Sequence, residues 1–185
     1  ETISFANNQY LEQESFRWKE RKHQFTLPPH ISHETKEYDL NKKVYAYIPY
    51  WIKTNEVHIE WELLSTLIIF SLVVDASGNI VNWHNWPRTD LIQEAHNNGV
   101  KVEVCVALFE GNQIATLLNS ASNRATLITQ LTDIITADNI DGIDIDFEQM
   151  NGTELNTFPV FMQELKNSIT AVKSSETLTS ALQSV

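Results

Sequence analysis

The sequence predicts an α/β fold built on a parallel sheet, because strand-like and helix-like segments alternate along most of the chain. The strand-like segments, rich in aliphatic, β-branched and aromatic residues, are 44–50 (VYAYIPY), 66–74 (TLIIFSLVV), 101–108 (KVEVCVAL), 140–147 (IDGIDIDF) and 178–184 (LTSALQS). Their first residues are 22, 35, 39 and 38 positions apart, a spacing typical of successive strand–helix units.

Residues 1–43 differ from the rest of the chain, since polar side chains dominate there and little periodicity is visible. One short helix is expected near 8–22, and Pro28 and Pro29 then break any helix. We therefore predict a polar N-terminal extension ahead of a folded domain over 44–185.

The first helix between strands has recognisable ends. Pro87 suits the first turn of a helix, and Gly99 stands where a left-handed residue ends one. Between them Leu91, Ile92 and Ala95 fall on one helical face. The pattern predicts a helix that packs this face against the sheet.

Two longer helices follow, at about 123–137 and 154–173, each with apolar residues at helical spacing. Residues 75–79 (DASGN) have the composition of a tight turn. We therefore expect the strand at 66–74 to turn back into a short return strand that ends near residue 82.

Composition and charge exclude several function classes. The 13 basic and 24 acidic residues give a net charge of −11, and the largest basic cluster is a scattered stretch at 19–22, so nucleic-acid binding is not expected. The longest apolar runs, at 67–70 and 72–74, are far shorter than a membrane span. The single cysteine, Cys105, has no partner for a disulfide and is expected to be a small buried residue.

Three acids define the candidate catalytic site. Asp144, Asp146 and Glu148 alternate with apolar residues, so on a strand they share one face. Neighbouring members would lie about 6.5–7 Å apart, which makes full ionisation costly and predicts a shared proton with at least one raised pKa. A carboxyl that stays protonated at neutral pH can act as a general acid. Glu148 comes last, at the carboxyl end of the strand, where sites of this fold class lie.

The three acids have two other possible interpretations. A solvated acidic edge strand does not explain the apolar residues that alternate with them. An EF-hand loop that starts at Asp144 would need glycine at its sixth position, where Gln149 stands, but a looser Mg²⁺ or Ca²⁺ site stays open. His84 has no acid or histidine at ligand spacing, so we expect a hydrogen-bonded loop histidine.

The segment 141–148 (DGIDIDFE) resembles the DGxDxDxE signature of glycoside hydrolase family 18, the chitinase-like enzymes. The segments 44–51, 65–80 and 97–108 are similar to the first three strands of that family. The resemblance implies a (β/α)8 TIM barrel. Such a barrel takes roughly 250 residues, so 44–185 would supply about its first half, strands 1–5.

The resemblance also implies roles for the acids. Glu148 would be the general acid/base, and Asp146 would orient the substrate's 2-acetamido group, whose carbonyl oxygen attacks the anomeric carbon. Asp144 would share a proton with Asp146, while Asp141 and Gly142 would be structural. No cofactor is implied.

Aromatic residues supply the candidate substrate-binding positions. By the resemblance, Tyr47 and Phe70 match positions that line the family's sugar pocket. Trp51, Trp83 and Trp86 follow strand ends or lie in loops, where an aromatic face can stack on a sugar ring or pack against a helix. We include Trp51 with Tyr47 and Phe70 as a substrate-binding candidate.

The sequence also departs from the family pattern. Residues 105–108 (CVAL) stand where the family commonly has Ser-x-Gly-Gly, and Phe147 replaces a common tryptophan. The expected partner is therefore an N-acetylglucosamine-containing polysaccharide, either chitin or peptidoglycan-like. Two alternatives stay open: a chitinase-like lectin without turnover, and a metal-bound interaction domain.

The expected half barrel has consequences for the chain by itself. The first and fifth strands would expose open sheet edges, which favours association, and the site would be incomplete, so we expect little or no activity from this chain alone. The chain begins with Glu1, which is typical of a processed or recombinant start. By the resemblance, a secreted, periplasmic or cell-surface location is expected.

Overall fold

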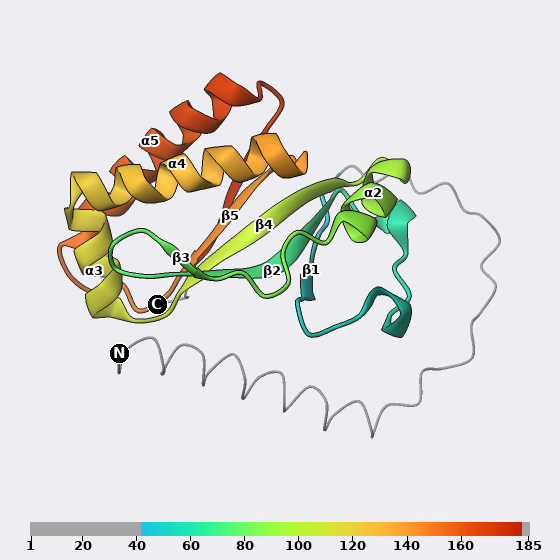
Figure 1. Cartoon of the computed structure of the whole chain (residues 1–185), viewed down its shortest axis with the longest axis horizontal. Helices are drawn as coiled ribbons and strands as arrows, with labels where there is room; N and C mark the ends of the chain where they lie inside the picture. The colour runs from blue at the N-terminus through green and yellow to red at the C-terminus, as the bar shows by residue number, and fades with distance from the viewer. Residues whose placement is uncertain (1–41, 183–185) are drawn as a thin grey trace. The chain divides into compact units, whose positions relative to one another are not determined.

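A computed structural model describes residues 42–182 of the chain (Figure 1). The expected short helix near 8–22 lies outside the described residues. The elements are β1 (Tyr45–Pro49), two short 3-10 turns η1 (Thr54–Glu56) and η2 (Trp61–Leu63), β2 (Thr66–Val74), β3 (Ile80–Asn82), α2 (Thr89–Asn97), β4 (Lys101–Leu108), α3 (Gly111–Asn119), α4 (Ala121–Asp138), β5 (Gly142–Phe147), α5 (Glu154–Val172) and β6 (Thr177–Ala181).

The sheet confirms the predicted α/β class. Its order is β1-β2-β4-β5-β6, and all four pairings along this path are parallel. The predicted return strand is present as β3, which pairs antiparallel with β2. In the turn between them, Asp75 accepts hydrogen bonds from the N–H groups of Ser77 and Asn79, and Gly78 has φ +85°.

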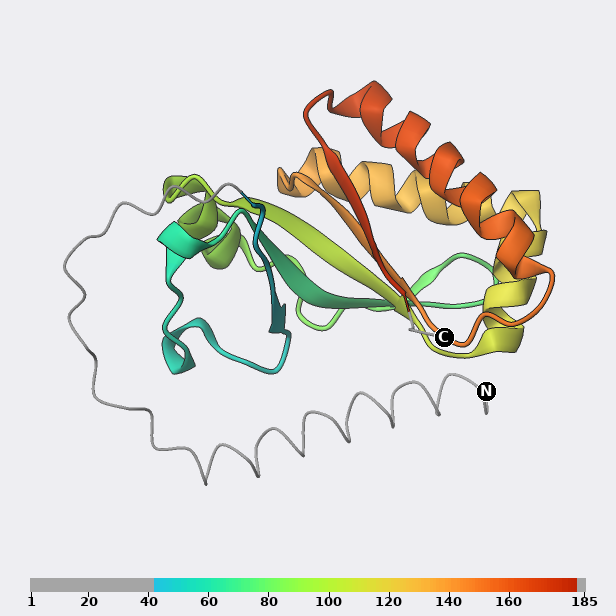
Figure 2. The same cartoon turned by 180° about the vertical axis from the view of Figure 1, so that it is seen from behind.

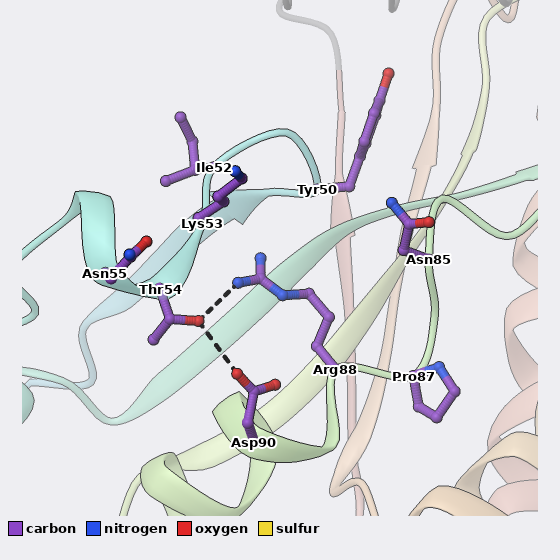
Figure 3. A pocket seen from close by; sticks show the side chains of 9 residues that line it. All are labelled: Tyr50, Ile52, Lys53, Thr54, Asn55, Asn85, Pro87, Arg88 and Asp90. Atoms are coloured by element: carbon purple, nitrogen blue, oxygen red, sulfur yellow. Dashed lines mark hydrogen bonds between the residues drawn. The ribbon is translucent and has the colours of Figure 1, made fainter.

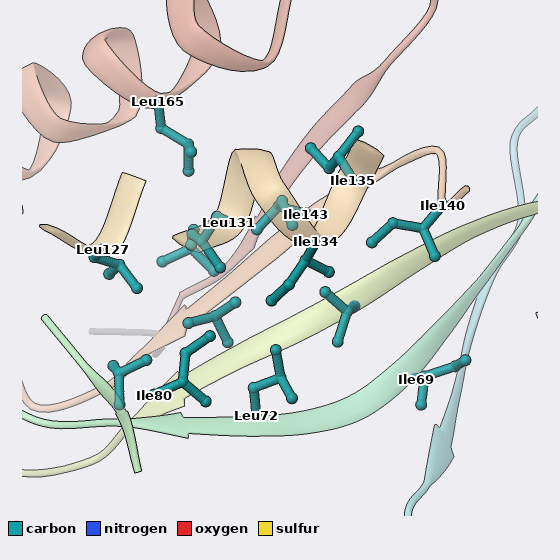
Figure 4. Packing of buried hydrophobic residues seen from close by; sticks show 14 of the residues in the cluster. Ile69, Leu72, Ile80, Leu127, Leu131, Ile134, Ile135, Ile140, Ile143 and Leu165 are labelled. Atoms are coloured by element: carbon teal, nitrogen blue, oxygen red, sulfur yellow. The ribbon is translucent and has the colours of Figure 1, made fainter. Parts of the chain in front are cut away.

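One face of the sheet packs against the helices and forms the core. Figures 1 and 2 show α4 and α5 side by side over the same face of the strands. In Figure 4, Leu131 of α4 and Leu165 of α5 lie on the same side of the sheet as Leu72 of β2 and Ile143 of β5, and all four are buried. Because strand side chains alternate, the opposite face is free to carry the polar residues of the site.

The position of Pro87 differs from the prediction. Pro87 lies outside the first turn of α2, which begins at Thr89. The cause is Arg88, whose backbone is non-helical (φ −94°, ψ 71°) and whose guanidinium donates a hydrogen bond to Thr54. Gly99 behaves as predicted, since it follows α2 with φ +73°.

The segment 111–138 contains two helices, and the prediction identified only the second. Ser120 is the one residue between α3 and α4, and its hydroxyl caps α4 by accepting a hydrogen bond from the N–H of Asn123. Asn139 ends α4 in the left-handed conformation. None of the described helices has the length and apolar character required to cross a membrane.

Asp141 and Gly142, at the start of β5, have structural roles. The Asp141 carboxylate accepts hydrogen bonds from His96 (2.7 Å), Lys173 (2.9 Å) and the N–H of Val102 (2.9 Å). Burial alone would raise the pKa of Asp141, but these hydrogen bonds outweigh burial and lower it. A Cβ at Gly142 would collide with the carbonyl of Thr177.

Asp141→Asn is expected to destabilise the fold by about 1–3 kcal/mol at neutral pH, because an amide cannot accept charge-assisted hydrogen bonds as the carboxylate does. The lowered pKa means that this stabilisation is present above the ordinary value of 3.8 and is lost as the pH falls through the folded value. Urea unfolding at neutral and strongly acidic pH measures both effects. The exposed Asp133→Asn on α4 is the control, and an equal effect of both variants would contradict the assignment.

Candidate active site

The acid row (Asp144, Asp146 and Glu148) lies along β5 and just beyond its last residue. Asp144 and Asp146 are 1% and 8% exposed, whereas Glu148 is half-buried. The apolar residues between them belong to the helix-facing core, so the acids occupy the other face of the sheet. The row therefore runs from a buried interior to the carboxyl edge of a parallel sheet.

Asp144 is held by two hydroxyl groups, one from β1 and one from the neighbouring strand β6. The Tyr47 hydroxyl of β1 donates to Oδ2 at 2.9 Å, and Oδ1 lies 2.7 Å from the hydroxyl oxygen of Thr179 on β6. Burial and the charge of Asp144 raise the pKa of Tyr47, so the phenol keeps its proton and remains a donor. Tyr47 thus lies at the acid row, whereas sequence reasoning missed Thr179.

Asp146 has a different environment, although it is only two residues away. Its register partners on the neighbouring strands are Ala107 and Ala181, whose side chains carry no hydrogen-bond donor. Burial, followed by the charges of Glu148 and Asp144, raises the pKa of Asp146 to about 7. The structure therefore gives the raised carboxyl pKa that the spacing of the acids predicts.

Cys105 is buried, as expected, but it faces the acid row, where it pairs in register with Asp144. Burial, followed by the charges of Asp144 and Asp146, raises the pKa of the thiol well above its ordinary value. Cys105 is therefore a neutral, weakly polar neighbour of Asp144 with no thiolate character.

The backbone after β5 fixes where Glu148 stands. The N–H of Glu148 donates to the carbonyl of Leu108, which ties it to the end of β4. Gln149 then has φ +66°. Its carbonyl oxygen lies so close to Gly111 that a Cβ on residue 111 would be only 2.6 Å from that oxygen. This turn places Glu148 at the carboxyl edge of the sheet.

Trp51 and Phe70 form an aromatic cluster with Tyr50 and His84. Tyr50 and Trp51 follow the end of β1, and Phe70 lies within β2. The rings of Trp51 and Phe70 meet edge to face at 6.1 Å, and Tyr50 stacks on His84 at 3.7 Å. The His84 ring donates from Nδ1 to the carbonyl of Ser71 at 2.8 Å, because a carbonyl oxygen can only accept, and burial lowers the pKa of the ring. The predicted loop histidine is thus confirmed as hydrogen-bonded.

The two remaining candidates among the loop tryptophans, Trp83 and Trp86, differ from each other in their exposure and contacts. The Trp86 indole N–H donates to Asp138 at 2.6 Å, and its ring packs against the core, which is a structural role. Trp83 is 43% exposed, so its ring is open to solvent.

A polar pocket of about 470 Å³ lies beside the aromatic cluster (Figure 3). It is lined by Tyr50, Ile52, Lys53, Thr54, Asn55, Asn85, Pro87, Arg88 and Asp90. Figure 3 shows Arg88 reaching to Thr54, whose hydroxyl also contacts Asp90. The lining includes none of the acid row, so this pocket is separate from the acids.

The geometry of the described residues does not match the metal-site interpretation. Within residues 42–182, no three His, Cys, Asp or Glu side chains are arranged to hold a metal ion. Instead, a hydroxyl donor compensates for the burial of Asp144, and the raised pKa of Asp146 lets that carboxyl keep its proton.

Solved structures of chitinases have the same fold. The chain is similar to a chitinase from Bacteroides thetaiotaomicron (TM-score 0.66, 24% identity, 78% of this chain and 47% of that one) and to one from Rhizomucor miehei (TM-score 0.62, 18% identity, 75% and 46%). It is also similar to the spore cortex-lytic enzyme of Bacillus megaterium (TM-score 0.61, 17% identity, 76% and 34%).

The chain spans less than half the length of each of these structures. The match confirms an α/β architecture that corresponds to part of a TIM barrel. Among curated proteins, none matches the sequence significantly.

Residues 43–185 match the family described as Glycosyl hydrolases family 18, which is most of the chain and all of the described sheet. The matched region contains the acid row, Tyr47, Phe70 and Trp51. The chain therefore belongs to glycosyl hydrolase family 18, a family of glycosidases.

Proposed function

We propose that this chain carries the general acid of a hydrolase that cleaves β-linked N-acetylglucosamine-containing glycans with retention. The observation that supports the proposal most directly is the contrast within the acid row: Asp144 accepts two hydroxyl contacts, while the pKa of Asp146 is raised to about 7. Near neutral pH, a proton is therefore available next to Glu148.

In this proposal Glu148 protonates the glycosidic oxygen and later takes a proton from the attacking water. Asp146 binds the N–H of the 2-acetamido group and turns its carbonyl oxygen toward the anomeric carbon. The substrate thus supplies the nucleophile, and the protein supplies orientation and protons. Asp144 stays fixed by Tyr47 and Thr179, and its charge keeps the proton of the pair on Asp146.

The aromatic cluster supports a glycan as the partner. Trp51 lies just beyond the end of β1, at the same edge of the parallel sheet as Glu148, and Phe70 lies within β2, in register with the last residue of β1. Aromatic faces at such an edge are suited to stacking on pyranose rings. We propose Trp51 and Phe70 as sugar contacts, and Tyr47 as a pocket residue that acts through Asp144.

Chitin and a peptidoglycan-like glycan both remain within the proposal, because the similar structures include chitinases and a spore cortex-lytic enzyme. A secreted, periplasmic or cell-surface location is proposed on the same basis. The presence of Glu148 together with Asp144 and Asp146 favours an enzyme over a non-catalytic lectin.

Glu148→Gln tests the enzyme directly. Loss of the general acid is expected to lower the release of new reducing ends from N-acetylglucosamine oligosaccharides by at least about 100-fold, in this chain and in any longer form of the protein that is active. Oligosaccharide affinity, measured by calorimetry, should persist. The exposed Glu94→Gln on α2 serves as the control. Binding without turnover in every form, with Glu148 intact, would instead indicate the lectin.

The substrate's acetamido group provides a second test. If its carbonyl oxygen is the nucleophile, an oligosaccharide without the N-acetyl groups should be cleaved at least about 100-fold more slowly, because in the proposed mechanism no protein carboxylate takes its place. Chromatography of the products from matched acetylated and deacetylated chains measures this difference. Equal rates would contradict substrate assistance and leave the glycosidase class intact.

Asp146→Asn tests the raised pKa. The folded state holds this proton up to about pH 7, whereas the unfolded chain releases it near 3.8, so wild-type stability falls as the pH rises between these values. The amide cannot ionise and should remove that fall. We expect the variant to melt at a higher temperature than the wild type near pH 8 and at a similar temperature near pH 4. A difference that does not change with pH would refute the assignment.

A further inference from the structure

Another buried carboxyl lies beside the acid row and is not part of the DGxDxDxE signature. Glu103 of β4 is 0% exposed, and it lies two residues before Cys105 on the same face of the sheet. The strand that carries it is otherwise apolar apart from its first residue. Burial of a carboxyl is costly unless its oxygens are hydrogen-bonded or it keeps its proton.

A single hydroxyl group connects Glu103 to the acid row. The Thr179 hydroxyl oxygen lies 2.6 Å from Oε2 of Glu103 and 2.7 Å from Oδ1 of Asp144. A threonine hydroxyl has one hydrogen, so it can donate to one of these carboxyls and must accept from the other. A carboxyl can donate only when it is protonated. Both short contacts are therefore favourable only if Glu103 or Asp144 carries a proton.

The surroundings assign that proton to Glu103. Both oxygens of Asp144 have a hydroxyl within hydrogen-bond distance, which suits an ionised group, whereas Oε1 of Glu103 is buried and has no hydrogen-bond partner among the described residues. An unpartnered carbonyl oxygen costs less than an unpartnered charged one.

The charges that face Glu103 agree with this assignment. Burial raises the pKa of Glu103 most, and the charge of Asp144 on β5 adds to the effect; the hydroxyls of Thr177 and Thr179 on β6 and the charge of Lys101 on β4 oppose it without cancelling it. On β2, the register partner of Glu103 is Ile68, which contributes no charge.

We propose that Glu103 is a positioning residue that carries a proton at neutral pH, donates it in a hydrogen bond to Thr179, and thereby directs the Thr179 hydrogen to Asp144. The inference rests on the proposed function for its catalytic consequence. The chain runs from Glu103 through Thr179 to an ionised Asp144, which also accepts from Tyr47. An ionised Asp144 keeps the proton of the Asp144–Asp146 pair on Asp146.

Infrared difference spectroscopy between the wild type and Glu103→Gln tests the protonation state without any need for activity. Near pH 6 an ordinary glutamate is almost fully ionised, so the expected loss of a protonated-carboxyl band identifies Glu103 as neutral. Loss of a carboxylate band instead would overturn the proposal. Glutamine has nearly the same shape and can still donate to Thr179, so this variant should fold.

Carboxyl-carbon NMR titration of Asp146 tests the positioning role. Glu103→Leu removes the donor and frees the Thr179 hydroxyl to turn away, so the pair's proton should move toward Asp144, and the pKa of Asp146 should fall by on the order of one unit. Glu103→Gln should restore the wild-type titration. Identical titrations for the leucine and glutamine variants would overturn the positioning role.

The kinetics of glycan hydrolysis test the catalytic consequence of the same substitutions. In an active form of the protein, Glu103→Leu should lower kcat about tenfold with little change in KM, because Asp144 loses its hydrogen bond from Thr179 but no sugar contact is lost. Glu103→Gln should recover most of that loss. If the wild type has no glycosidase activity, the proposed function fails, while the infrared and NMR results still decide the state of Glu103.

Discussion

The two-sided character of β5 is the constraint on which the rest of the structure depends. One face of this strand must be apolar, because Ile143, Ile145 and Phe147 fill the core beneath α4 and α5. Alternation then sends Asp144 and Asp146 to the other face, where neighbouring strands bury them as well. A one-residue shift in the register of β5 would place the acids in the core and remove them from the site. The same register therefore fixes both the packing of the core and the placement of the acids.

Burial affects the two aspartates differently because their lateral neighbours differ. Asp144 lies between Cys105 and Thr179 and accepts the Tyr47 hydroxyl, so donors compensate for its loss of water. Asp146 lies between two alanines, so for it the loss of water dominates, and protonation relieves the cost. The choice of small or hydroxyl residues on the flanking strands thus decides which member of the pair holds the proton.

Local sequence patterns predicted the structural features that depend on residues close together in the sequence. The acid row follows from a period of two, and the return strand follows from a turn whose residues all lie within 75–79. What the sequence could not predict depends on partners far along the chain: the shifted start of α2 results from Arg88 reaching Thr54, and the hydroxyl of Thr179 meets Asp144 only after β6 pairs in register. Glu103 was visible as an acid in an apolar strand, but its significance appears only through Thr179.

Parallel topology explains how the proposed sugar contacts and the acid row come to share one sheet. All five strands of the main path point the same way, so Trp51 beyond β1 shares an edge with Glu148, which comes 97 residues later in the sequence. The proton-holding groups lie deeper, between paired strands, where neighbouring backbones fix them. Loops at the edge can therefore change to suit different glycans without disturbing the buried chain from Glu103 to Asp144. Under the proposed function, the shared chemistry of the acids is built into the strands, and the selectivity among glycans is built into the edge.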